Sequence, residues 1–237
     1  MILTMLIGKI IVWLNSGGKF GLLTLALLVG GCGDAGIVNR TPLSIPVDSE
    51  VVDSVVVDTA FVVDEGAISP EILVRVLPVD GFDYPVGPPN ARDYYKFRGF
   101  LPKDLEHLGE DWNGTGGGNT DLGDYVYAAA DGVVFYAEDH GGGWGLVIRM
   151  VHNYGSKAIP QYIETLYAHV ASAWVHPGNR MKRGEIIGTI GNAGGIYHAH
   201  LHFEMRKAIG KGIRAGYAGD TAGFVDPTKF IEAHRPK

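Results

Sequence analysis

The chain has 237 residues and 46% hydrophobic content, which suits one mid-sized globular domain with additional segments. Its formal net charge of −6 excludes the strongly basic surface that nucleic-acid binding requires, so we expect no nucleic-acid partner. The one cysteine, Cys32, excludes an intramolecular disulfide and a cysteine-rich structural zinc site.

Residues 1–31 predict an export signal that is not part of the fold. Lys19 precedes an apolar run over residues 20–29. The segment 28–32, Leu-Val-Gly-Gly-Cys, resembles a bacterial lipobox, which implies cleavage before Cys32 and attachment of lipid to it. A plain transmembrane anchor with a chance cysteine is the alternative. We therefore expect a cell-envelope protein, anchored to a membrane by lipid and facing the periplasm or the exterior.

Residues 32–70 predict an acidic tether between this signal and the domain. Residues 33–70 hold seven acidic side chains and one basic side chain, together with scattered prolines and small polar residues. That composition suits an extended, solvated segment. Two β-prone runs, 51–57 and 61–63, leave open an added strand.

Residues 71–237 predict an all-β domain, because short strand patterns alternate with turn residues; an antiparallel sheet or sandwich follows. We expect a first strand over 72–77 and a hairpin formed by 125–130 and 133–137, turning at Asp131-Gly132. Further elements are expected as strands over 145–152, 162–170 and 185–190 and a helix over 227–233.

Residues 198–204 alternate histidine with apolar residues and are predicted to form a strand. Side chains two positions apart share a strand face, so His198, His200 and His202 should line one face while the intervening residues face a core. The Cα atoms of His200 and His202 would lie about 6.6 Å apart. At that spacing both imidazoles reach one metal ion, or one binds the ion while the other reaches what the ion holds. A histidine-rich edge strand with no chemical task is the alternative.

Two other clusters bear on this choice. On a straight strand His107 and Asp111 would be about 13 Å apart, too far to share an ion held about 2 Å from each ligand. The chain must therefore turn between them, which Gly109 permits. His169 follows Leu-Tyr-Ala at 166–168 and alone carries little information.

Taken together and in this order, the clusters resemble the lysostaphin/LytM-type zinc metallopeptidases, which cut peptidoglycan. The resemblance covers residues 95–232, and its combined specificity is high. Its motifs are His-x-Gly-x-Asp at 107–111, a hairpin motif at 126–134, Tyr-Ala-His at 167–169, His-Leu-His-Phe-Glu at 200–204 and Val-Asp-Pro at 225–227.

The resemblance implies one Zn²⁺ ion held by His107, Asp111 and His202, and a sheet with long loops around a groove. Zinc lowers the pKa of bound water to about 7 and polarises a scissile carbonyl. His169 and His200 are left as the catalytic pair that moves protons and steadies the oxyanion, with the base not assigned between them. Peptidoglycan is the implied partner, with cross-links or stem peptides as the substrate.

Two rival functions stay open. A catalytically silent relative would bind the wall or activate an amidase, but such relatives typically lose metal ligands, and none is missing here. A surface β-domain with incidental histidines is the other. The stretches 112–124 and 156–161 are longer than the family pattern, and they border the groove in the family, so they bear on substrate choice.

Overall fold

The computed structural model describes residues 67–101, 106–213 and 220–236. The predicted signal over 1–31, lipidation of Cys32 and the tether up to residue 66 lie outside the described residues. Within the described ranges, no helix is long and apolar enough to cross a membrane.

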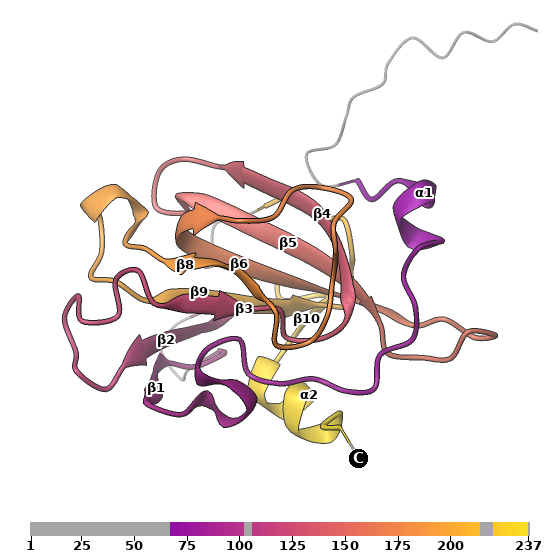
Figure 1. The fold of residues 1–237 in the computed structure, drawn as a ribbon, viewed down its shortest axis with the longest axis horizontal. Coiled ribbons are helices and arrows are strands. Elements are labelled where there is room, and N and C mark those ends of the chain that lie inside the picture. Colours follow the sequence, from indigo (N-terminus) through magenta and orange to yellow (C-terminus); the bar gives the residue numbers. More distant parts are fainter. Residues whose placement is uncertain (1–66, 102–105, 214–219, 237) are drawn as a thin grey trace, which may run out of the picture. The chain divides into compact units, whose positions relative to one another are not determined.

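The described residues form one antiparallel sheet of ten strands with two short α-helices, and the predicted all-β class is confirmed (Figure 1). The main path of the sheet runs β1-β2-β9-β6-β5-β4-β7, while β10 pairs with β9, and β8 joins β6 to β3. The elements are α1 (Pro70–Leu73), η1 (Gly87–Ala91), β1 (Tyr94–Arg98), β2 (Glu110–Gly114), β3 (Tyr125–Tyr127), β4 (Gly132–Asp139), β5 (Leu146–Asn153), β6 (Tyr162–Ala173), β7 (Arg180–Met181), β8 (Ile186–Ile190), η2 (Ala193–Gly195), β9 (Leu201–Arg206), β10 (Phe224–Val225) and α2 (Pro227–Ala233).

Strand β9 divides the domain into two sides, because alternate side chains point to opposite faces of a strand. Both sets are buried, but only one is apolar. The apolar set, which joins the main core, is Leu201, Phe203 and Met205. The polar set is His202, Glu204 and Arg206.

The apolar face is covered by the chain that enters β1 and by α2, which lie on the same side of the sheet (Figure 1). Phe82 is fully buried and packs edge-to-face on Phe230 of α2, with ring centroids 5.4 Å apart. Its backbone N–H donates to the His234 carbonyl at 2.9 Å. The Arg183 guanidinium pairs with Asp83 beside it. The chain before the first strand is thus part of the core.

The expected strand over 72–77 is wrong, because α1 occupies Pro70–Leu73. Ser69 caps the helix by accepting a hydrogen bond from the Ile72 N–H, and Pro70 has the fixed φ that suits a first helical position. This local signal outweighs the β propensity of the residues that follow. The helix predicted over 227–233 is confirmed as α2, capped by Asp226.

The expected hairpin over 125–137 is also wrong. β3 pairs with β8, whereas β4 pairs with β5 and β7. The three alanines between β3 and β4 (128–130) are at most 1% exposed, and the Ala128 N–H donates to the Glu185 carbonyl at 2.9 Å. Small buried residues carry the chain through the core to a different partner, so Asp131-Gly132 does not close a hairpin.

The histidine strand is shorter than expected. β9 begins at Leu201, and His198 and His200 belong to the loop that follows η2. The His200 N–H donates to the Gly191 carbonyl at 3.3 Å, which closes this loop back on itself. The prediction of three histidines on one strand face is therefore wrong, and His198 is exposed.

Candidate metal centre

Strand register brings two predicted ligands together, since Asp111 of β2 lies opposite His202 of β9. His107 is carried there by the predicted bend at Gly109. A Cβ atom on Gly109 would lie 2.5 Å from the Phe203 carbonyl oxygen and 2.8 Å from Glu204 Cγ. Glycine is thus required because the bend presses against β9.

One donor atom from each of the three predicted ligands forms a corner of a small, nearly equilateral triangle. His107 Nε2 lies 3.1 Å from His202 Nδ1 and 3.2 Å from Asp111 Oδ1, and His202 Nδ1 lies 2.9 Å from the same oxygen. Donors placed tetrahedrally at zinc's usual bond length of 2.0–2.1 Å are about 3.3 Å apart. All three side chains are buried. Two imidazoles and a carboxylate at this spacing fit Zn²⁺.

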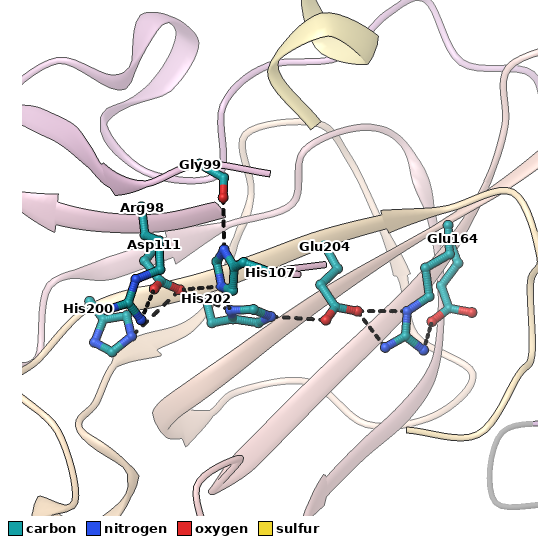
Figure 2. A network of polar contacts seen from close by, with 9 residues as sticks. Arg98, Gly99, His107, Asp111, Glu164, His200, His202 and Glu204 are labelled. Carbon is teal, nitrogen blue, oxygen red and sulfur yellow. Dashed lines mark hydrogen bonds and ion pairs between the residues drawn. The ribbon is translucent and has the colours of Figure 1, made fainter. Parts of the chain in front are cut away.

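Both histidine ligands are oriented by their second ring nitrogen (Figure 2). His107 Nδ1 lies 3.0 Å from the Gly99 carbonyl oxygen, and His202 Nε2 lies 3.0 Å from Glu204 Oε1. Both oxygens are acceptors, so each of these nitrogens carries the proton. The lone pairs on His107 Nε2 and His202 Nδ1 are therefore left for a metal ion.

The charges around the triangle favour a cation. Burial alone would raise the pKa of Asp111, but hydrogen bonds from His107 and His202 hold it well below its usual range. Burial alone would lower the pKa of His202, whereas its hydrogen bonds to Asp111 and Glu204 raise it to about 9. The two carboxylates thus stabilise positive charge at this position, and a metal ion replaces the proton at a ligand nitrogen.

His169 reaches the same side of the sheet through a break in strand geometry. Its φ of 60° lies in the left-handed region, and the register of β6 against β5 shifts between Ile148 and Leu146. By simple alternation His169 would follow Tyr167 into the core; a bulge re-aims such a side chain. Burial, together with nearby His202 and His200, lowers the pKa of His169 to about 3.

His200 stands beside the triangle without forming a corner of it. Its Nδ1 donates to the His198 carbonyl oxygen at 2.8 Å, so its Nε2 is the acceptor in the neutral ring. That Nε2 lies 3.8 Å from Asp111 Oδ1. The rings of His200 and His169 are 4.6 Å apart, and both residues line the same groove.

The model of peptidase family M23 matches residues 107–216. Over this stretch the chain is similar to M23 peptidases. The match contains the triangle, His169 and His200, and His107, Asp111 and His202 are its zinc site.

Individual relatives match over a shorter span. The cell division protein DipM of Caulobacter vibrioides is 36% identical over 83 residues, which is 35% of this chain and 12% of DipM. The DD-carboxypeptidase/endopeptidase Mpg of Neisseria meningitidis serogroup B is 37% identical over 81 residues, 34% of this chain and 17% of Mpg. This chain therefore spans less than a fifth of the length of either relative. Among solved structures, lysostaphin from Staphylococcus simulans aligns with a TM-score of 0.45 and 26% identity, covering 60% of this chain and 50% of lysostaphin.

Two residues that support the metal ligands precede the family match and were not predicted from the sequence. Arg98 ends β1 opposite Asp111, and its guanidinium lies 3.6 Å from Asp111 Oδ2. Gly99 supplies the carbonyl that orients His107. In the sequence Arg98 only follows a cluster of aromatic residues at 94–97, and nothing distinguishes it from a surface arginine.

A groove of about 730 Å³ opens over the metal site. The stretch 112–124, which is longer than the family pattern, forms part of the rim of this groove. Gly118 lines the groove, and Asn119 Oδ1 accepts the Ala199 N–H at 2.8 Å. Trp112 is instead a core residue, at 6% exposure. The lining consists of Tyr95, Phe97, Arg98, His107, Asp111, Asn113, Gly118, Gly143, Trp144, His169, Ile196, Tyr197, His198, His200 and His202.

Proposed function

We propose that this chain is a zinc-dependent endopeptidase that hydrolyses peptide bonds in peptidoglycan cross-links or stem peptides. The observation that carries the proposal is the three-donor triangle at an open groove inside an M23 domain. Catalytic zinc sites have three protein ligands and an open position, whereas structural sites are closed by four. The similarity to Mpg, a DD-carboxypeptidase/endopeptidase, supports the choice of substrate.

The ligand residues would hold zinc through His107 Nε2, Asp111 Oδ1 and His202 Nδ1. When bound, zinc polarises a carbonyl and lowers the pKa of its water to about 7. The bonds to Gly99 and Glu204 keep both rings in the tautomer that ligation needs.

In this proposal His200 is the proton acceptor. Its Nδ1–H is committed to the His198 carbonyl, which leaves Nε2 unprotonated and directed toward the ligands. A general base must reach the proton it takes, directly or through one water. His169, on the same side, would donate a hydrogen bond to the oxyanion. Its strained backbone supports an active role, because such strain persists where a side chain must be aimed.

The groove walls suit an extended peptide. Phe97 of β1 lines the groove and is 62% exposed. Ile196 and Tyr197, which follow η2, also line the groove and are 56% and 44% exposed. Exposed apolar side chains lining a concave site are typical of ligand contact surfaces. In this proposal they supply apolar contact to the bound peptide.

We further propose that the enzyme acts in the cell envelope, held to a membrane by lipid on Cys32. Support comes from Lys19, the apolar run over 20–29 and the lipobox-like residues 28–32. Mass spectrometry of the mature N-terminus tests this part. A lipidated Cys32 is expected, and an intact Met1 or an unmodified Cys32 would contradict it.

Digestion of purified peptidoglycan sacculi tests the activity. The full-length chain, kept in mild detergent, should release defined muropeptides detected by mass spectrometry, and a chelator should stop the release. His202→Ala should lose the metal and all hydrolysis, because it removes a ligand. His200→Ala should keep the metal and lose hydrolysis. Loss of metal in both variants would overturn the division of roles.

The result also separates the rival functions. Zinc retention without release of muropeptides would favour a silent wall-binding or amidase-activating relative. Failure to retain zinc would favour a surface β-domain with incidental histidines.

A further inference from the structure

A row of buried ionisable side chains leads away from the metal centre along the polar face of the sheet. The five members come from three adjacent strands, and none is more than 4% exposed. Beyond the metal ligand their charges alternate in sign. In order the row is His202, Glu204, Arg206, Glu164 and Arg149.

The first links of the row divide the two oxygens of Glu204 between different partners (Figure 2). Oε1 accepts from His202 Nε2 at 3.0 Å. Oε2 accepts from Arg206 Nε at 2.8 Å and also from its Nη2. Arg206 Nη1 in turn lies 3.6 Å from Glu164 Oε1. Guanidinium offers donors and no acceptor, so whatever faces Arg206 must present an acceptor.

The far end of the row is fixed to the chain that follows β9. Glu164 takes a two-pronged contact from Arg149, at 2.8 and 3.0 Å. Glu164 Oε2 also accepts the Gly210 N–H at 2.9 Å, and Arg149 Nη2 donates to the Lys211 carbonyl. Arg206 is therefore held between two buried carboxylates.

Burying four charges costs free energy that apolar residues of similar size would avoid. Their arrangement has one feature that an apolar substitute would lack, which is a defined direction for the His202 proton. We infer that Glu204 and Arg206 are positioning residues of the zinc site. Arg206 fixes the Glu204 carboxylate, and Glu204 holds His202 with Nε2–H turned away from the metal and the Nδ1 lone pair turned toward it. The inference rests on the zinc site of the proposed enzyme and not on its substrate.

The decisive variant is Glu204→Gln, which keeps the shape of the side chain. Because Arg206 demands an acceptor, the oxygen of the new amide faces Arg206 and its NH₂ faces His202 Nε2. Two donors then oppose each other, and the tautomer that binds metal is disfavoured. We expect zinc affinity of the full-length chain, measured by competition with a chelating dye, to fall about 10–100-fold.

Glu164→Gln is the matched control, since this residue is equally buried and makes the same kind of contact with an arginine. It is one link further from His202, so it should lower stability while zinc affinity stays close to that of the unaltered chain. Equal losses of zinc affinity in the two variants would mean that the row supports only the fold, and would overturn the inference.

Adding Arg206→Met to Glu204→Gln tests the role of Arg206. Without the guanidinium, the amide is free to rotate and present its oxygen to His202, so the double variant should bind zinc more tightly than Glu204→Gln alone. Arg206→Met by itself completes the cycle. Proton NMR of the zinc-loaded chain gives a readout independent of affinity. The His202 Nε2–H should resonate downfield and exchange slowly in the unaltered chain, and lose both properties in Glu204→Gln. An unchanged resonance, or no recovery in the double variant, would contradict the assignment.

Discussion

The two faces of β9 are equally buried, yet they achieve burial by different means. Phe203 and its neighbours contact apolar side chains from the chain before β1 and from α2. Glu204, the next residue, is also 0% exposed, but its two carboxylate oxygens accept hydrogen bonds from His202 Nε2 and Arg206 Nε. Adjacent positions of one strand are therefore buried by different kinds of contact, apolar packing on one face and hydrogen bonds on the other.

The apolar face thus constrains the volume of a side chain, whereas the polar face constrains how its polar groups are paired. On the apolar face a side chain is acceptable when it fills its space, because dispersion and hydrophobic contacts are non-directional. On the polar face each donor needs an acceptor in one place, because an unpaired buried charge is costly. Four substitutions test this contrast between the two faces.

The largest effect is expected from Arg149→Met on the polar face. It removes the two-pronged partner of Glu164 and leaves that carboxylate buried with Arg206 at 3.6 Å. Breaking a buried pair from one side costs about 3–5 kcal/mol of folding free energy. Urea denaturation of the zinc-loaded chain measures the loss.

The double variant Arg149→Met, Glu164→Leu provides the control. Removing both partners leaves no uncompensated charge, so it should be more stable than Arg149→Met alone. If the double variant is the less stable of the two, pairing does not govern this face.

A pH effect of about 3 kcal/mol is expected from His152, a polar residue held within the apolar core. Burial lowers its pKa from 6.5 to about 4. In the neutral ring Nδ1–H donates to the Asp131 carbonyl, and Nε2 lies 2.8 Å from Thr165 Oγ1. Since the unfolded chain binds the proton more readily, stability is fully present above pH 6.5 and is lost as the pH falls from there toward 4.

Denaturation of the chain and of His152→Gln at pH 7.5 and pH 4.5 checks this prediction. The variant lacks the titrating ring, so the difference in stability between the two proteins should shrink at the lower pH. A constant difference would mean that folding does not shift the pKa of His152.

A smaller effect is expected from Ile148→Val on the apolar face. Ile148 is fully buried in the main core, and removing one methylene there costs about 0.5–1.5 kcal/mol. Zinc affinity should not change, because the substitution disturbs no directional contact. A thermal melt and a dye competition assay together measure both quantities, and a loss of several kcal/mol would show that volume is as strictly specified as pairing.

The smallest effect on stability is expected from His169→Asn. Asparagine tolerates the left-handed conformation better than most residues, so the change should shift folding free energy by no more than about 1 kcal/mol in either direction. Hydrolysis of sacculi should be lost if the side chain is catalytic. A stable variant with full activity would remove His169 from the mechanism.

Local patterns in the sequence predicted the all-β class and the helix at 227–233, and the resemblance of its combined motifs to a known family predicted the three metal ligands. The predicted partner of β3 was wrong, because the three small buried alanines that redirect the chain resemble one strand of a hairpin in the sequence. The side chain of His169 departs from the alternation expected of a strand because of a bulge in β6. Such a bulge depends on the neighbouring strands, so the sequence of β6 alone does not reveal it. Arg98 was missed because its role depends on register with β2, which no single stretch reveals.

The place of Arg98 and Gly99 outside the family match has a consequence for protein engineering. A chimera that transplants residues 107–216 into another scaffold would carry every ligand, but not the carbonyl that orients His107 or the guanidinium beside Asp111. The segment that can be exchanged as a working module therefore begins upstream of β1, and similarity alone would place the splice point inside the metal centre.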